Sequence, residues 1–252
     1  STSHILAISG YNIAIVGYVF LVVLTRFFFR RTACWYAGAG MILFVILTGA
    51  SASVVRAGLM GLLVLLAHGS GRWYQPRNAL ILVAGLMIWH NPLVLVFDVG
   101  FQLSFLAVIG LLYLYPILKE RWLRHYPTSD VAELIGMTLS AQIFVLPFLI
   151  YYFHTFSLIS LVANILILPV IPFTMLWGFL AGLLGLVWSP LGQLAGWIAW
   201  ALSNYQINVV QYLASLPYAA VTVSIHWVVM VAIYAGLFGW MWRVSRFAKK
   251  EK

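Results

Sequence analysis

Two charged residues, Arg56 and Asp98, lie in stretches of the sequence that are otherwise apolar. On insertion scales, a charge at the centre of a membrane-spanning helix costs about 2.5 to 3.5 kcal/mol, and less near an interface. Another interaction must therefore offset this cost. The two residues either form a structural ion pair between two helices or line a water-filled mouth where Arg56 meets an anionic ligand, and these interpretations are not exclusive.

Further polar side chains recur near the ends of apolar runs and could line the same mouth. Gln102 lies four residues after Asp98, so both side chains fall on one face of a helix. The other candidates lie at the start of the first apolar run and of a later run that contains prolines: His4, Ser9, Asn12 and Asn164. We expect these residues to converge at the outer end of the fold.

The stretch from Gly192 to Leu216 carries no charge, yet it is amphipathic. Its amide and indole side chains fall at helical spacing on one face: Gln193, Trp197, Trp200, Asn204, Asn208 and Gln211. Amide groups that faced lipid would lack hydrogen-bond partners, which costs free energy. We therefore expect this face to meet water or a passage, whereas most other aromatic residues are expected in the core and in the interfacial belts.

The elements that must position these residues are membrane helices. Of the 252 residues, 64% are hydrophobic and 8% are charged, whereas a soluble domain carries about 25% charged residues. The single cysteine, Cys34, excludes an intramolecular disulfide and a thiolate zinc site. The expected fold class is all-α, a polytopic transmembrane helix bundle that forms one domain over residues 1–252 of a longer protein.

Charges, glycines and prolines divide the sequence into apolar runs. The run that begins at Asn78 meets His90-Asn91-Pro92 after 13 residues, about 20 Å of helix, so we expect a break before Phe97. Pro169 and Pro172 predict a discontinuous or re-entrant helix between residues 158 and 187. The other expected runs cover residues 8–24, 33–47, 53–68, 101–118, 133–153 and 225–242.

The basic residues predict an orientation. The formal net charge is +9. Nine crossings place 13 of the 14 Lys and Arg residues on one side, and so do seven if the proline-broken segment is re-entrant and the amphipathic helix lies in the outer interface. By the positive-inside rule this side is the cytoplasm. The sequence therefore predicts an inner-membrane protein whose C-terminus is cytoplasmic, with Arg56 and Asp98 near the outer ends of their helices.

Several stretches resemble motifs of one family of membrane proteins. They are His4-Ile5-Leu6-Ala7-Ile8-Ser9-Gly10, then Val55-Arg56-Ala57-Gly58, and then Asn91-Pro92 followed by residues 98–105, which read DVGFQLSF; Phe156-Ser157 with Ala163-Asn164 and Pro169 is a weaker match. With the order of the hydrophobic runs, they resemble the membrane core of the ComEC competence family over almost the whole chain. Tyr11 and Asn12 depart from the Leu and His that the family pattern favours.

That resemblance implies a channel that passes single-stranded DNA into the cytoplasm during natural transformation. It also implies an external DNA receptor and a cytoplasmic ATPase as partners, beside the lipid bilayer and a possible homo-oligomer. The ATPase would be a separate protein, because the chain has no GxxxxGK[ST] motif. In this setting Arg56 would contact DNA phosphate, and Trp197 and Trp200 could stack on bases.

Neither catalysis nor a cofactor is expected of this chain. Its six histidines lie far apart, and it has no HxHxDH, HExxH or GxSxG motif. The alternative function is a secondary transporter of a small solute, which the broken helices favour. The absence of an evident inverted repeat and of an ionisable residue at mid-depth argues against that alternative.

Overall fold

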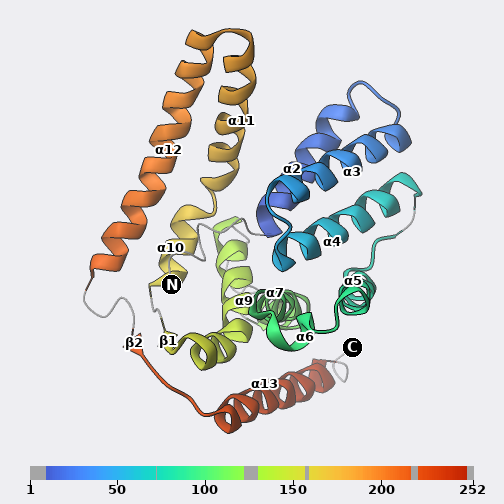
Figure 1. The fold of residues 1–252 in the computed structure, drawn as a ribbon. Helices are drawn as coiled ribbons and strands as arrows, with labels where there is room; N and C mark the ends of the chain where they lie inside the picture. Colours follow the sequence, from blue (N-terminus) through green and yellow to red (C-terminus); the bar gives the residue numbers. More distant parts are fainter. Residues whose placement is uncertain (1–9, 72, 122–129, 157–158, 217–220, 249–252) are drawn as a thin grey trace. The chain divides into compact units, whose positions relative to one another are not determined.

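The computed structural model describes residues 10–71, 73–121, 130–156, 159–216 and 221–248. These residues are helical almost throughout, which confirms the predicted fold class (Figure 1). The chain forms two compact units, an N-terminal unit over Thr2–Val108 and a C-terminal unit over Ile109–Lys252. Within each unit the helices pack against one another.

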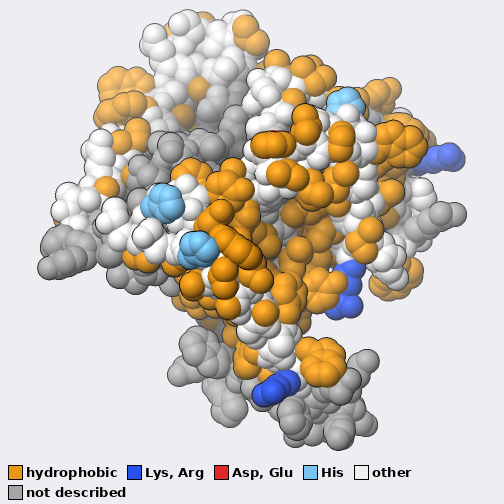
Figure 2. Space-filling model, turned by 60° about the horizontal axis from the view of Figure 1, so that its bottom comes forward, with side chains coloured by type: hydrophobic (Ala, Val, Ile, Leu, Met, Phe, Trp, Pro, Cys, Tyr) orange, Lys and Arg blue, Asp and Glu red, His pale blue; other side chains and the backbone are white. Residues whose placement is uncertain are grey.

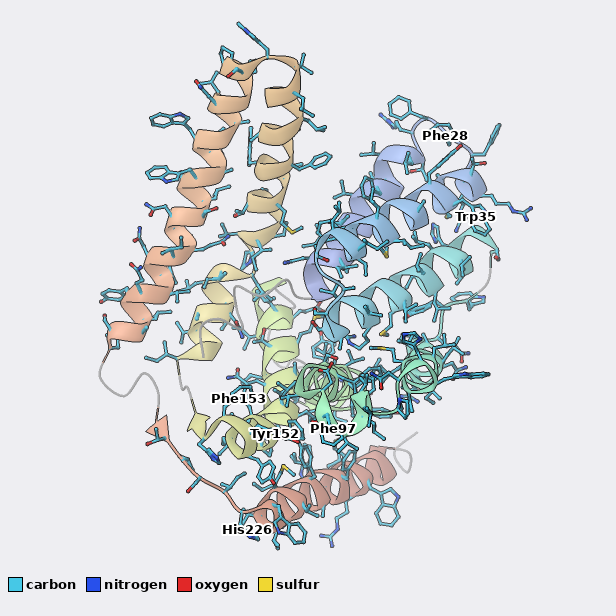
Figure 3. All side chains as sticks on the ribbon, in the orientation of Figure 1. Phe28, Trp35, Phe97, Tyr152, Phe153 and His226 are labelled. Atoms are coloured by element: carbon cyan, nitrogen blue, oxygen red, sulfur yellow. The ribbon has the colours of Figure 1, made fainter. Side chains whose placement is uncertain are left out.

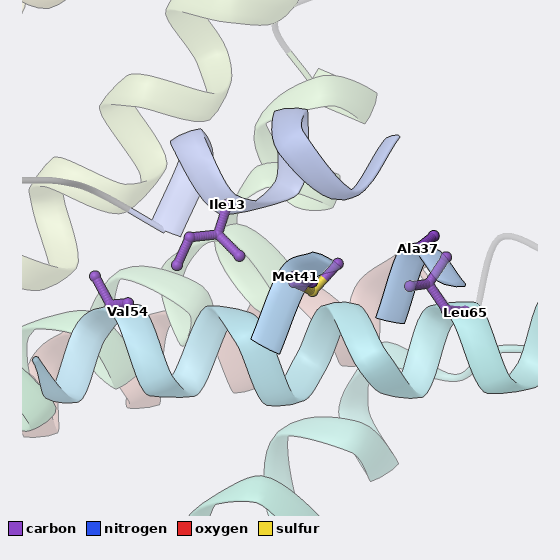
Figure 4. Packing of buried hydrophobic residues seen from close by; sticks show 5 residues of the cluster. All are labelled: Ile13, Ala37, Met41, Val54 and Leu65. Carbon is purple, nitrogen blue, oxygen red and sulfur yellow. The ribbon is translucent and has the colours of Figure 1, made fainter. Parts of the chain in front are cut away.

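Three helices form the core of the N-terminal unit: α2 (Gly10–Leu24), α3 (Arg30–Leu47) and α4 (Ala52–Gly69). Short connections join them, so that successive helices run antiparallel and all three pack together. Buried side chains from each helix meet between them, as Figure 4 shows: Ile13, Ala37, Met41, Val54 and Leu65. Gly58 permits the close contact of α4 with α3, because a Cβ there would lie 2.7 Å from the side chain of Val45.

The predicted break after His90 is confirmed. Helix α5 (Pro76–His90) ends there, the four-residue helix α6 (Val94–Phe97) follows, and α7 (Val99–Ile109) begins after Asp98. The side-chain oxygen of Asn91 accepts a hydrogen bond from the backbone N–H of Leu93 at 3.1 Å. This bond stabilises the turn that Pro92 forces after α5.

A π-helix, η1 (Gly110–Leu114), continues α7 into the C-terminal unit and leads into α8 (Tyr115–Arg121). It packs against α9 (Asp130–Phe153), where a Cβ on Gly110 would lie 2.4 Å from the carbonyl oxygen of Ser140. Only glycine allows that approach. The hydroxyl of Tyr234, in α13 (Trp227–Ala248), donates to the carbonyl of Phe144 at 2.7 Å and so attaches α13 to α9.

The predicted discontinuity at the prolines is also confirmed. Helix α10 (Ser160–Ile167) ends before Pro169, and α11 (Ile171–Val187) begins with Pro172 in its first turn, where no backbone N–H is needed. Helix α11 then forms an antiparallel hairpin with α12 (Ser189–Ser215). At the closed end of the hairpin the backbones of α11 and α12 approach closely, because a Cβ on Gly192 would lie 2.4 Å from the Cα of Gly185.

The sequence did not predict one small element of the C-terminal unit. Strands β1 (Thr155–Phe156) and β2 (Val221–Thr222) pair antiparallel. His154 precedes β1 with a positive φ of 53°, and its carbonyl accepts the N–H of Val223 at 3.0 Å. The ladder joins the end of α9 to the segment that leads into α13.

The surface has the composition of a membrane protein. Four helical segments in the described part of the chain are long and apolar enough to cross a bilayer: Ala52–Gly69, Val99–Glu120, Ala132–Phe153 and Trp227–Val244. Hydrophobic side chains cover much of the face in Figure 2. In Figure 3, Phe28 and Trp35 project outward, and Trp35 is 67% exposed. Exposed rings of this size suit contact with lipid. The choice between seven and nine crossings stays a prediction.

Candidate functional site

Arg56 is a buried cation in the second turn of α4, with 9% of its surface exposed. Its guanidinium carbon lies 5.9 Å from the centre of the Phe105 ring in α7. The Nη1 atom lies 3.5 Å from the sulfur of Met60, one turn further along α4. Phe105 in turn packs on Phe101, with 4.3 Å between ring centres. The guanidinium therefore contacts one aromatic ring, that of Phe105, and the thioether of Met60.

These contacts do not replace the hydration that Arg56 loses. A cation–π contact is worth about 2 kcal/mol when desolvated, whereas burying an ion costs several kcal/mol. The Nε of Arg56 is buried and has no hydrogen-bond partner among the described residues. An anion beside the guanidinium would both neutralise the charge and accept this hydrogen.

The ion pair between Arg56 and Asp98 does not form in the described residues, which corrects one of the two interpretations made from the sequence. The Oδ1 atom of Asp98 instead accepts the backbone N–H of Phe101 at 2.9 Å. This geometry is an N-cap, in which the carboxylate satisfies a free N–H in the first turn of α7. Asp98 therefore fixes the start of the helix that carries Phe105.

Gln102 stabilises the same break from within α7. Its Nε2 donates to the carbonyls of Leu95 and Val96, at 2.7 and 3.1 Å. These carbonyls belong to α6, whose single turn leaves them without helical donors. Asp98 and Gln102 thus each have local structural partners at this break. The Oε1 of Gln102 is buried without a hydrogen-bond partner in the described residues.

The first apolar run contributes one described candidate. Asn12 lies in the first turn of α2, and its Oδ1 is buried without a hydrogen-bond partner in the part of the chain described here. It can still accept a hydrogen bond from water or a ligand. His4 and Ser9 lie outside the described residues.

The remaining candidates belong to the C-terminal unit. Asn164 is half-buried in α10. On α12, Trp197 is 71% and Trp200 is 63% exposed, while Asn204 is half-buried and Asn208 is exposed. The opposite face of α12 packs on α11, where the Nε2 of Gln206 donates to the Oγ1 of Thr174 at 2.7 Å. The face that carries the indole and amide groups therefore points away from the hairpin partner.

Sequence reasoning did not identify Phe105 and Met60 as partners of Arg56. Met60 lies at i+4 from Arg56, a spacing that places both on one face of a helix and could have shown this contact. The pairing with Phe105 depends on how α4 and α7 rotate against each other, which no local pattern gives. No group of three or more His, Cys, Asp or Glu side chains that could hold a metal occurs within the described ranges.

Four apolar helical segments of membrane length in the described part of the chain define a helical membrane protein. A family model described as "Competence protein" matches residues 1–247. The chain therefore belongs to the competence protein family.

A curated relative supports this assignment. The chain is 36% identical over 183 residues to ComE operon protein 3 of Bacillus subtilis (strain 168). The match covers 72% of this chain and 23% of that relative, so the chain corresponds to a minor part of the longer protein. No solved structure matches the chain at a significant level.

Proposed function

We propose that this chain forms a membrane passage through which single-stranded DNA enters the cytoplasm during natural transformation. Membership of the competence family supports this role, together with the match of residues 4–10 and 98–105 to the family motifs. The passage would conduct the polyanion without chemistry in the membrane part. The driving force would come from a cytoplasmic ATPase, and an external receptor would deliver the DNA.

The burial of Arg56, which has no counter-ion among the described residues, carries the proposal. A guanidinium matches the geometry of a phosphate group and binds it through two parallel hydrogen bonds. The ring of Phe105, on which Phe101 packs, holds the guanidinium in place before a phosphate arrives, which reduces the entropy lost on binding. A single cation of this kind would contact successive phosphates in turn, whereas a row of cations would retain the strand.

The exposed face of α12 is a second candidate for DNA contact. Trp197 and Trp200 present two large apolar rings, and every nucleobase can stack on such a surface. Asn204 and Asn208 continue the same face with groups that both donate and accept hydrogen bonds. In the proposed orientation, the protein lies in the inner membrane with its C-terminus in the cytoplasm.

The proposal is tested by the uptake of labelled DNA in cells whose full-length gene carries Arg56→Ala. If Arg56 contacts the phosphate backbone, uptake is lost while the abundance of the protein in the membrane stays close to wild type. Trp35→Ala is the matched control, because this exposed ring lies on α3 of the same unit. If cells with Arg56→Ala contain the protein at normal abundance and take up DNA normally, Arg56 does not contact the DNA.

A secondary transporter of a small solute is the alternative function, and the breaks at α5–α6–α7 and α10–α11 favour it. In such proteins the ends of broken helices bind the substrate near the middle of the membrane. The two functions differ in one measurement. Deletion of this segment from the full-length gene abolishes DNA uptake only if the passage conducts DNA.

A further inference from the structure

A cavity of about 420 Å³ lies between the start of α3 and the end of α4. Its volume falls in the range of small-molecule sites. The lining residues come from both helices and from the segment after α4: Arg30, Val64, Ala67, His68, Gly71, Trp73 and Tyr74. His68 lies 12 residues beyond Arg56 on α4, about 18 Å along the helix. The cavity is therefore separate from the site at Arg56.

The polar groups of the cavity favour an anion. Arg30 is a permanent cation, and no ion pair involves it in the described part of the chain. It stands at the first position of α3, where the helix dipole is positive, and the first turn contains no acidic residue. Burial raises the pKa of Tyr74, so its hydroxyl keeps its proton and can donate at neutral pH. The indole N–H of Trp73 is also a donor.

The apolar part of the cavity identifies the kind of anion. Val64 and Ala67 belong to α4, one of the four segments that can cross a bilayer, and they form the wall nearest the middle of this helix. Trp73 is 97% exposed and Phe29, beside Arg30, is 89% exposed. Such freely exposed rings beside a basic group are typical of the interface between lipid headgroups and acyl chains.

We propose that this cavity binds the phosphate headgroup of an anionic phospholipid. Arg30 and the donors of Trp73 and Tyr74 contact the phosphate, while the acyl chains leave along Val64 and Ala67. In the orientation proposed above, this end of α4 lies on the cytoplasmic side, so the lipid would belong to the inner leaflet. The bound lipid would hold α3 against α4. The proposal is independent of the function proposed above.

The test uses full-length protein in a neutral detergent, with bound lipid counted by native mass spectrometry. The probes are phosphatidylglycerol, which is anionic, and phosphatidylcholine, which is not. We expect the wild-type protein to bind phosphatidylglycerol more tightly than phosphatidylcholine. Arg30→Gln should weaken phosphatidylglycerol binding about tenfold, as the loss of one charged hydrogen bond predicts. Arg31→Gln is the matched control, because Arg31 is the exposed neighbour with the same charge and does not line the cavity.

A second variant tests the cavity without changing a charge. Ala67→Phe fills the space beside Val64 and is expected to weaken phosphatidylglycerol binding as much as Arg30→Gln, while thermal unfolding of the protein reports whether the fold is kept. Equal binding by Arg30→Gln and Arg31→Gln would overturn the proposal. Inorganic phosphate that displaces the lipid would assign the site to a free anion, and displacement by a single-stranded oligonucleotide would assign it to DNA. Either result overturns the assignment to lipid.

Discussion

The guanidinium of Arg56 lies 5.9 Å from the centre of the Phe105 ring, and this contact joins α4 to α7 within the N-terminal unit. Both residues are buried. The contact offsets part of the cost of burying this charge, with which no carboxylate of the described residues pairs. Phe105 and Asp98 therefore have different roles. Phe105 contacts the cation, and Asp98 caps the helix that carries Phe105.

Phe105→Leu should destabilise the protein by removing the cation–π contact. The expected coupling between Arg56 and Phe105 is about 0.5 to 2 kcal/mol in a double-mutant cycle with Arg56→Met. Thermal unfolding of the full-length protein in detergent measures it. Phe97→Leu is the control, since this ring on α6 is 75% exposed and should change stability little. Additive effects of Arg56→Met and Phe105→Leu would show that the contact contributes nothing.

Asp98→Ala should cost about 1 kcal/mol, the usual value of a lost N-cap. Asp98→Asn should retain most of the wild-type stability, because its side-chain oxygen can still accept the N–H of Phe101. An ion pair with Arg56 would give the opposite pattern, with Asn as harmful as Ala and with recovery in the double mutant Arg56→Ala, Asp98→Ala. Membrane abundance and thermal unfolding of the three variants distinguish the two cases.

Gly192→Ala should separate the α11–α12 hairpin at its tip. The added methyl group would lie 2.4 Å from the Cα of Gly185, and this backbone cannot move aside cheaply. Gly196→Ala, one turn further along α12, meets nothing within 4 Å. Alanine is favoured over glycine within a helix by about 1 kcal/mol, so this control should be neutral or stabilising. If the two variants unfold at the same temperature, the close approach has no energetic role.

The orientation of α4 can be read from cysteine labelling in a Cys34→Ala background. Ser51 and Ser70 are exposed at the two ends of this helix. The charge distribution predicts that Ser51→Cys reacts with a membrane-impermeant reagent in intact cells, and that Ser70→Cys reacts only after the cells are opened. The reverse pattern would invert the predicted topology.

The helices were largely predictable because membrane helices are continuous apolar runs that end at charges, glycines or prolines. The breaks at Asn91-Pro92 and at Pro169 were predictable for the same reason, since proline removes a helical hydrogen bond. The π-helix at Gly110 was not, because it depends on the contact of Gly110 with Ser140 in α9. The β1–β2 ladder pairs residues that lie far apart in the sequence, and two-residue strands leave no periodic signal.

For the site, the sequence identified the unusual residues but not all of their partners. Arg56 and Asp98 stood out because charges are rare in apolar runs. Of the two interpretations that the sequence left open, the ion pair does not form among the described residues. The signal for a cap was present in Asp98, which precedes a helix start by one position. The Arg56–Phe105 contact requires the packing of α4 against α7, which no property of either segment alone specifies.

In the proposed passage, incoming DNA passes beside Arg56. A photoreactive residue in place of Met60, whose sulfur lies 3.5 Å from the guanidinium, tests it during the uptake of labelled single strands. We expect a protein–DNA crosslink at position 60 and none at position 66, where Leu66 is exposed on the same helix. If cells that take up DNA normally show no crosslink at position 60, DNA does not pass beside Arg56.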